Sequence, residues 1–344
     1  MIKTPQQKKE LIISKAKELG FISIGITTSQ TSDRLDFFYK WIENGFNAEM
    51  TYLARPDRLK RREYLMNILE NIKSVIMLCY PYSYYVERKS EQNTGFISSF
   101  ALMEDYHLLI EEKLNKLSNY IKDSFNANTK SYIDSSPIFE RDFASRCGLG
   151  FIGKNTMLIH NTAPCFIGEI LTDLELPVDD LVMSSKCDNC TLCLKNCPTG
   201  AIKEPYLLDA NKCISYLTIE HKGVIPLQLR HLLGNKIFGC DNCQIVCPFI
   251  KDIKNEIPEE YNKLYNPDLI ELLSLTQEGF KKLFFKTPVI RIGIERFKRN
   301  VIVALGNIGD KTALEILKAF KQTQVSQLLN EHLIWAITEI EKKT

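Results

Sequence analysis

The sequence predicts an α/β protein that carries a cysteine-rich insert and a helical tail. Patterns typical of strands and of helices alternate over residues 1–180, which predicts helices layered on a sheet. Eight cysteines then crowd into residues 187–247, and beyond Pro258 the chain turns helical. A chain of 344 residues is long enough for two or three domains. We therefore expect three, at residues 1–180, 181–255 and 256–344.

The elements of the first domain follow from local spacing. Apolar residues recur at helical intervals in residues 6–19 and 105–123. Short apolar runs predict four strands, at residues 21–26, 74–80, 131–133 and 166–174. A glycine-rich loop, residues 148–156, lies between the last two of these strands. Layered sheets of this kind place their ligands near strand ends.

The tail is expected to be a stack of helices that presents an extended surface. Three helical segments, residues 300–310, 312–320 and 328–340, resemble a short HEAT-type repeat. Just before them, residues 281–299 hold seven basic side chains against one acid, Glu295. Such a run is typical of a surface that binds a polyanion such as RNA, and a solvated helix face is the alternative.

The composition is that of an ordinary soluble protein, with 44% apolar and 25% charged residues. No stretch approaches the roughly 18–20 apolar residues of a membrane span, and the start of the chain does not read as an export signal. Clustered cysteines without such a signal favour a reducing cytoplasm and metal ligation over disulfides.

The first four clustered cysteines form a C-x2-C-x2-C-x3-C-P pattern that ends at Pro198. Three thiolates so spaced can hold one face of an iron–sulfur cubane, while the fourth reaches another cluster. Transferred to this chain, the two-cluster pattern gives two sets, Cys187, Cys190, Cys193 and Cys247, and Cys197, Cys213, Cys240 and Cys243. Eight sulfurs suffice for two [4Fe–4S] clusters, and structural zinc is the alternative. We expect Cys79, Cys147 and Cys165 to be buried, inert thiols.

The size of the first domain suggests that it binds a catalytic cofactor. The glycines of residues 148–156 lack the acidic partner of a dinucleotide site. Asp134 ends a strand beside a turn, where burial could raise the pKa of its carboxyl and make it a general acid. A turn or helix-capping role is the alternative. Asp105 and His107 begin a helix, as an N-cap residue and a partly buried imidazole or as functional groups.

Five segments together resemble the epoxyqueuosine reductase family, over most of the chain. They are Ile133-Asp134-Ser-Ser-Pro137-Ile-Phe-Glu140-Arg141, Gly148-Leu-Gly150-Phe-Ile-Gly153-Lys154-Asn155-Thr156, Gly168-Glu-Ile-Leu-Thr-Asp173, Cys213-Ile-Ser-Tyr-Leu-Thr-Ile-Glu220 and Gly239-Cys-Asp-Asn-Cys-Gln244. Jointly these motifs are specific, although each alone would not be. Members of the family often have a cysteine near the position of Ser98.

The resemblance implies base-off cobalamin in the first domain, two [4Fe–4S] clusters, and tRNA bound across the clusters and the tail. The implied reaction reduces epoxyqueuosine to queuosine in the tRNA anticodon loop, the final step of queuosine biosynthesis. Co(I) would attack the epoxide, and Asp134 would be the proton donor. The implied cobalamin contacts are Arg62, Ser98, Asp134, Gly153, Lys154, Asn155, Thr156 and Ser215. For tRNA we expect contacts from Lys222, Arg291, Arg296, Lys298 and Arg299.

The expected partners are tRNA carrying epoxyqueuosine and a low-potential one-electron donor of the flavodoxin or ferredoxin type. We expect a cytoplasmic monomer that does not bind membranes. One alternative is a reductive dehalogenase with a corrinoid and iron–sulfur clusters, which usually carries an export signal and lacks a helical tail. Another is a ferredoxin-like electron-transfer protein without catalysis of its own.

Overall fold

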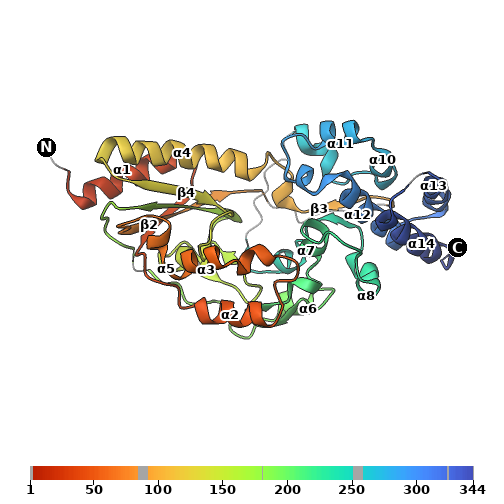
Figure 1. The fold of residues 1–344 in the computed structure, drawn as a ribbon, viewed down its shortest axis with the longest axis horizontal. Coiled ribbons are helices and arrows are strands. Elements are labelled where there is room, and N and C mark those ends of the chain that lie inside the picture. The colour runs from red at the N-terminus through yellow and green to blue at the C-terminus, as the bar shows by residue number, and fades with distance from the viewer. Residues whose placement is uncertain (1–2, 84–91, 180, 251–258, 324, 344) are drawn as a thin grey trace.

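The computed structural model describes residues 3–343 apart from 84–91, 180, 251–258 and 324. Figure 1 shows an elongated molecule, with the N-terminal sheet and its helices at one end and the C-terminal helices at the other. The cysteine-rich segment lies between them. The expected domain boundaries, at 180/181 and 255/256, fall on or beside residues outside this description.

A four-stranded sheet with the order β1-β2-β7-β4 forms the N-terminal part. Its strands are β1 (Ser23–Thr27), β2 (Ser74–Pro81), β4 (Thr129–Ile133) and β7 (Cys165–Thr172). Every neighbouring pair is antiparallel. The helices of this part are α1 (Pro5–Glu18), α2 (Leu35–Glu43), α3 (Pro56–Glu63), α4 (Tyr106–Phe125) and α5 (Glu140–Arg146). Each strand and helix expected here is present, with ends shifted by a few residues.

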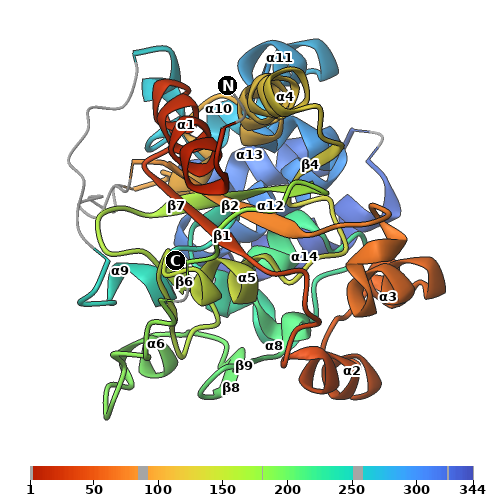
Figure 2. The ribbon, with the colours of Figure 1, turned by 90° about the vertical axis from the view of Figure 1, so that its left-hand side faces the viewer.

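Helices cover both faces of the sheet, as Figure 2 shows for α1 and α4 on one side and α5 on the other. Successive residues of β7 alternate between the two layers because side chains of a strand point to opposite faces. Ile170 packs in the core that α1 and α4 cover, and Leu171 packs in the core that α5 covers. Glu169 therefore shares the α5 side of the sheet with Leu171.

Short elements carry the cysteines. They are α6 (Leu192–Lys195), the hairpin of β8 (Ile202–Glu204) and β9 (Leu207–Leu208), α7 (Ile214–Ile219), α8 (Leu227–Arg230), β10 (Lys236–Phe238) and α9 (Asn242–Ile245). A second hairpin, of β5 (Phe151–Ile152) and β6 (Leu158–Ile159), lies in the glycine-rich loop region. Helix α6 carries Cys193, α9 carries Cys243, and Cys213 is the N-cap residue of α7.

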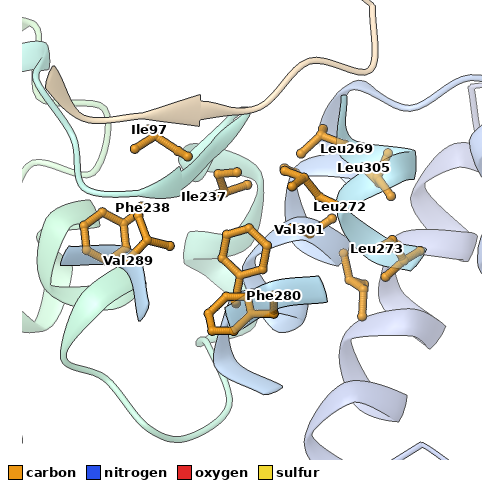
Figure 3. Packing of buried hydrophobic residues seen from close by; sticks show 14 of the residues in the cluster. Ile97, Ile237, Phe238, Leu269, Leu272, Leu273, Phe280, Val289, Val301 and Leu305 are labelled. Carbon is orange, nitrogen blue, oxygen red and sulfur yellow. The ribbon is translucent and has the colours of Figure 1, made fainter. Parts of the chain in front are cut away.

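The C-terminal helices are α10 (Leu269–Ser274), α11 (Gln277–Leu283), α12 (Gly293–Ile308), α13 (Lys311–Lys321) and α14 (Gln327–Glu341). Their core also takes in a segment of the first expected domain, as Figure 3 shows for Ile97 beside Ile237 and Phe238. Strand β3 (Phe96–Ile97) pairs in parallel with β10. The N-terminal part and the tail are thus joined through one apolar core. The HEAT-type arrangement remains a prediction. Within the ranges that the structure describes, none of the helices has the length and apolar character needed to span a membrane.

Candidate active site and cluster sites

The structure gathers one predicted thiol set around a single cavity. Its lining includes all four members of that set, Cys187, Cys190, Cys193 and Cys247. The same cavity is lined by Gly153, Lys154 and Asn155 of the glycine-rich loop. Cys187 and Cys247, which are 60 positions apart in the sequence, therefore meet at one place, as the crossed two-cluster pattern requires.

The other four thiols form the second set. Cys243 lies close enough to Cys240, Cys213 and Cys197 to feel their charge. Cys213 in turn feels the charge of Cys197. The 26 residues between Cys213 and Cys240 hold α7, α8 and β10, so folded structure brings Cys213 back to its set.

The chemistry of these thiols fits an iron–sulfur centre. Burial raises the pKa of Cys240 to about 12 and also raises that of Cys243 and Cys213. A thiolate is the species that binds metal, and an apolar site disfavours it unless positive charge is present. Iron supplies that charge, since a metal-bound thiol is deprotonated outright. Cys147, outside both sets, is buried with its pKa raised to about 12, as expected of an inert thiol.

The glycine-rich loop lies between the two thiol sets. The Nζ of Lys154 donates to the carbonyl oxygen of Cys190 at 3.0 Å. The side-chain amide of Asn155, which is buried, donates to the carbonyl oxygen of Cys243 at 3.1 Å. At the end of the loop, Arg141 donates to the carbonyl oxygen of Thr156 at 3.1 Å. The loop therefore connects both cluster sites to the start of α5, close to Asp134. Ser215 is half-buried in the first turn of α7, two residues after Cys213.

Ser98 lies against the second thiol set. Its hydroxyl donates to the carboxylate of Asp241, the residue after Cys240. Both Ser98 and Asp241 are buried, and the backbone N–H of Ser99 donates to the second Asp241 oxygen at 2.9 Å. Because its hydroxyl is engaged inside the protein, Ser98 supports the cluster segment, and this geometry does not favour it as a direct contact of a bound corrinoid.

Asp134 lies at the end of β4 with its side chain 60% exposed. The hydroxyl of Tyr106 donates to its Oδ2 at 2.8 Å, and Nε2 of His107 is 3.5 Å from the same oxygen. On the other side of the imidazole, Nδ1 of His107 is 2.9 Å from Asp105. Arg291, from the 3-10 turn before α12, completes the chain with its Nε 2.7 Å from Asp105. We call these five residues the Asp134 network.

The network reverses the expected shift at Asp134. Interaction with His107, aided by Tyr106, holds the pKa of the Asp134 carboxyl below its ordinary value, although burial acts in the opposite sense. The prediction of a raised pKa is therefore wrong. At His107, burial opposes protonation, but hydrogen bonds with Asp105 and Asp134 outweigh it and raise the pKa of the imidazole. The proton of the pair consequently resides on His107, with Asp134 as the anion.

Asp105 also caps a helix, as the alternative interpretation expected. Its side chain accepts a hydrogen bond from the backbone N–H of His107 and so begins α4. Sequence reasoning missed Tyr106 as a partner of Asp134, because 28 residues separate the two. It also missed Glu140 and Glu169, although Glu169 could have been noticed as a lone carboxylate within an apolar strand.

Arg62 provides an observation that fits a further bound group. Its guanidinium is buried and stacked on Phe38 and Phe139, with its centre 4.4 and 5.2 Å from the two ring centroids. Its Nε finds no hydrogen-bond partner among the residues that the structure describes. A buried donor without an acceptor is costly, and the amide carbonyls or phosphate of a corrinoid can serve as that acceptor.

The basic run corrects one of the predicted RNA contacts. Arg299 is 0% exposed. Its five N–H groups are used in five hydrogen bonds, to the carbonyl oxygens of Leu217, His221 and Gly223 and twice to Oδ1 of Asn300. Arg299 therefore joins α12 to α7 and the chain after it, and no donor is left for a phosphate.

The side chains of the other predicted RNA contacts differ in how exposed they are and in whether they already bind within the protein. Arg296 is half-buried and donates to the carbonyl oxygens of Ile219, Arg291 and Ile292. Lys298 is half-buried over the ring of Phe320, and burial lowers the pKa of its amine. The side chain of Arg291 is 47% exposed, and Lys222 is exposed.

Replacing Arg299 by Met is expected to destabilise the fold by about 3 kcal/mol or more, because several buried carbonyls would lose their donor. Thermal unfolding of the cluster-loaded protein measures the effect. The matched control is Lys222→Met, which removes an exposed cation and should leave the melting temperature within about a degree. Equal melting temperatures for both variants would contradict the structural role of Arg299.

The fold and the two thiol sets define an iron–sulfur oxidoreductase with a catalytic domain ahead of its clusters. A family model for a 4Fe-4S double cluster binding domain matches residues 186–250. The epoxyqueuosine reductase of Escherichia coli (strain K12) is 38% identical over 338 residues, which cover 95% of this chain and 88% of the relative. This chain belongs to the epoxyqueuosine reductase family, the oxidoreductases that reduce epoxyqueuosine to queuosine.

A second family model, described as "Epoxyqueuosine reductase QueG, DUF1730", matches residues 62–135. Among solved structures, an epoxyqueuosine reductase with a tRNA-Tyr epoxyqueuosine-modified stem loop aligns with a TM-score of 0.90 at 30% identity, covering 98% of this chain and 91% of its own. A Bacillus subtilis epoxyqueuosine reductase, with its Asp134 catalytic loop swung out of the active site, aligns at 0.89 and 29%, with the same coverage. The double-cluster model confirms the predicted pair of [4Fe–4S] clusters, and the family supports cobalamin as the further cofactor.

Proposed function

We propose that this chain reduces epoxyqueuosine within tRNA and that Asp134 delivers the proton to the departing oxygen. The observation that carries this role is the exposed carboxylate at the end of β4, which accepts a hydrogen bond from Tyr106 and lies beside Nε2 of His107. The reaction is balanced by two electrons and two protons, which convert the epoxide into an alkene and water. Nucleoside mass spectrometry after anaerobic incubation with reductant, cobalamin and epoxyqueuosine-containing tRNA tests it. Recovery of unchanged epoxyqueuosine would overturn it.

Cobalamin, when bound, would supply the low-valent metal chemistry that breaks the carbon–oxygen bond, and the clusters would supply its electrons. Residues 153–156, in contact with both thiol sets, and the unpartnered Nε of Arg62 are the groups that would hold it. Arg141, which donates to the carbonyl oxygen of Thr156, also lies close enough to Asp134 for its charge to lower the pKa of that carboxyl. The chain itself contributes orientation of the substrate and the proton.

The proton path begins at His107. Asp105 orients the imidazole through Nδ1, which leaves Nε2 directed at Asp134. As the departing oxygen gains charge, a proton moves from His107 to Asp134 and from Asp134 to that oxygen, which leaves His107 neutral and Asp134 again an anion. A general acid placed in this way typically contributes about 10²–10⁴-fold to the rate.

Because the pKa of His107 is raised, the imidazolium persists above its ordinary range near 6.5 and is lost as the pH rises through the raised value. The single-turnover rate is therefore expected to be constant at lower pH and to fall on the alkaline side. Rates measured between about pH 6 and pH 9 test this. His107→Gln should lower the plateau and remove the part of the alkaline fall that comes from loss of the imidazolium proton. A variant that keeps the wild-type profile would exclude His107 as the proton source.

For tRNA we propose a rim formed by Lys222, Phe285, Lys286 and Arg291. Arg291 contacts Asp105, and the carbonyl oxygen of Lys286 accepts the backbone N–H of Asp105 at 2.6 Å, so both lie beside the Asp134 network. Arg296 connects the carbonyls of Arg291 and Ile219, which brings the segment before Lys222 to the same rim. Phe285 is 67% exposed and offers a face on which an unpaired base can stack.

The double variant Lys222→Gln, Lys286→Gln is expected to weaken tRNA binding and to reduce the slope of log K against log salt by about 1.4 to 1.8, close to one counterion for each lysine. Both residues are exposed, so the fold should be unaffected. Filter binding at several salt concentrations measures the slope. Lys8→Gln, Lys116→Gln serves as the matched control, because both lysines lie on the helices of the N-terminal sheet. An unchanged slope would exclude this rim.

We further propose that the chain works as a cytoplasmic monomer with a low-potential one-electron donor of the flavodoxin or ferredoxin type. The thiolate chemistry, which needs a reducing compartment, supports the location. The three-domain division at 1–180, 181–255 and 256–344, with a HEAT-like tail for tRNA, remains our working description. The core that Ile97 shares with the tail indicates that the first and third parts fold together.

A further inference from the structure

Beneath Asp134 lie two more carboxyl groups, Glu140 and Glu169. Glu169 belongs to β7, an inner strand of the sheet, and its side chain is 0% exposed. One of its oxygens accepts a hydrogen bond from the hydroxyl of Ser136 at 2.5 Å. The other is buried and has no partner within the described part of the chain. A carboxyl in such a place on an α/β sheet requires a reason, because burial without pairing is costly.

The turn that carries Asp134 is the feature these groups support. Asp134 has a φ of 56°, in the left-handed region that non-glycine residues rarely adopt. The backbone N–H of Ser135 donates to the carbonyl oxygen of Ile133 at 2.6 Å, which closes a tight three-residue turn around Asp134. Turns of this kind are rare and strained, and they persist only where surrounding groups hold them.

Each carboxyl contacts one side of this turn. Glu169 holds Ser136, two residues after Asp134, and is in register with Tyr132 on β4. Glu140, the first residue of α5, lies close enough to Asp134 for its carboxylate to attract the backbone N–H of that residue. The two side chains also lie close enough to each other for their charges to interact. Thus a strained turn has one anchor from the sheet and one from the helix.

We propose that Glu140 and Glu169 are positioning residues that hold the Asp134 turn in its active-site position, Glu169 through Ser136 and Glu140 through the backbone amide of Asp134. The inference rests on the proposed role of Asp134 as proton donor. It gives a physical reason for a buried carboxyl pair that the chemistry of the reaction does not itself use. The Bacillus subtilis relative, whose catalytic loop has been seen swung out, indicates that such a turn can leave its site.

The anchors depend on protonation. Burial and the nearby Glu140 raise the pKa of Glu169 well above its ordinary value, so it acts as a neutral acid. Burial and the charge of Asp134 raise the pKa of Glu140 to about 8, against the opposing effects of Arg141 and Arg62. Among the described residues, the other titratable groups near this cluster include His107, Tyr106 and Tyr52, at Asp134, and Tyr132, beside Glu169. As the pH rises through about 8, Glu140 becomes charged, and its repulsion of Asp134 then opposes the turn.

Hydrogen–deuterium exchange of the peptide that covers residues 133–137 tests the anchors, because it contains the bonded amide of Ser135. The cluster-loaded enzyme and its Glu169→Met and Ser136→Ala variants are compared at one pH. We expect exchange to become about tenfold faster in each variant, because a strained turn persists only where surrounding groups hold it. Glu169→Gln, which keeps an acceptor for Ser136, should recover most of the protection. If Glu169→Met fails to fold, Ser136→Ala carries the test.

The charge of Glu140 is tested by the pH dependence. The ratio of the exchange rate of the Glu140→Gln variant to that of the parent enzyme should change near pH 8. The same ratio for the His107→Gln variant should not change there. The positioning role would be overturned, even if Asp134 proves essential, by exchange and single-turnover rates equal to those of the parent enzyme in all three variants, Glu169→Met, Ser136→Ala and Glu140→Gln. If instead Asp134→Asn remains active, the proton-donor role fails, and a loosened turn in the three variants would still be seen in the exchange data.

Discussion

Replacing Asp134 by Asn is expected to lower the single-turnover rate by about 10²–10⁴-fold. Asparagine has nearly the same size and can still accept the hydrogen bond from Tyr106, but it has no proton to pass on. The rate should fall because the departing oxygen would have to leave without a proton donor. The thiol sets and residues 153–156 are unchanged in this variant. Rapid mixing of the reduced, cobalamin-loaded enzyme with substrate tRNA, followed by nucleoside analysis, measures it.

The control for this variant is Asp123→Asn, an exposed aspartate near the other end of α4. It changes the net charge by the same amount and should leave the rate unchanged. Visible spectra of both variants should show full cluster and corrinoid content. An Asp134→Asn enzyme within about threefold of the parent rate would remove Asp134 from the chemistry.

Replacing Cys213 by Ala is expected to lower the iron content from about eight to about four atoms per chain and to abolish turnover. The displaced ligand is the least conventional part of the cluster pattern, so its loss tests the assignment directly. Cys247→Ala should also leave about four iron atoms, but in the other cluster. Metal and acid-labile sulfide analysis gives the counts, and electron paramagnetic resonance of the reduced proteins distinguishes which cluster remains.

Cys147→Ala is the matched control for both cluster variants. Cys147 is buried between α5 and the sheet, outside both thiol sets, and should keep about eight iron atoms. Two results would contradict the wiring. One is a Cys213→Ala protein that retains full iron, and the other is the loss of the same cluster in the Cys213 and Cys247 variants.

The sequence predicted the main elements and the site of the acid because both depend on local patterns. The strand that ends at Ile133 and the turn after it place Asp134 at a sheet edge without knowledge of the rest. The sign of its pKa shift could not be predicted in this way. Tyr106 and His107 come from another element, and without them burial is the only local effect that can be foreseen.

Arg299 shows the same limit for charge patterns. Cations in such a run are usually exposed, so the sequence predicted that Arg299 contacts RNA together with Arg291, Arg296 and Lys298. Helix α12 instead packs against several elements, including α7, β10 and α14, so two of its polar residues, Arg299 and Asn300, are internal. The carbonyl groups that Arg299 binds come from residues at least 76 positions away, and no spacing within the run identifies them.

The ion pair of Arg291 with Asp105 would couple RNA binding to the protonation of His107. Asp105 also holds His107, so the guanidinium and the imidazolium share one buried anion. An RNA phosphate that engaged Arg291 would compete with Asp105 for it, and the released carboxylate would then favour the proton on His107 more strongly. Binding of tRNA and protonation of His107 would thus be thermodynamically linked, and each would strengthen the other by the same factor.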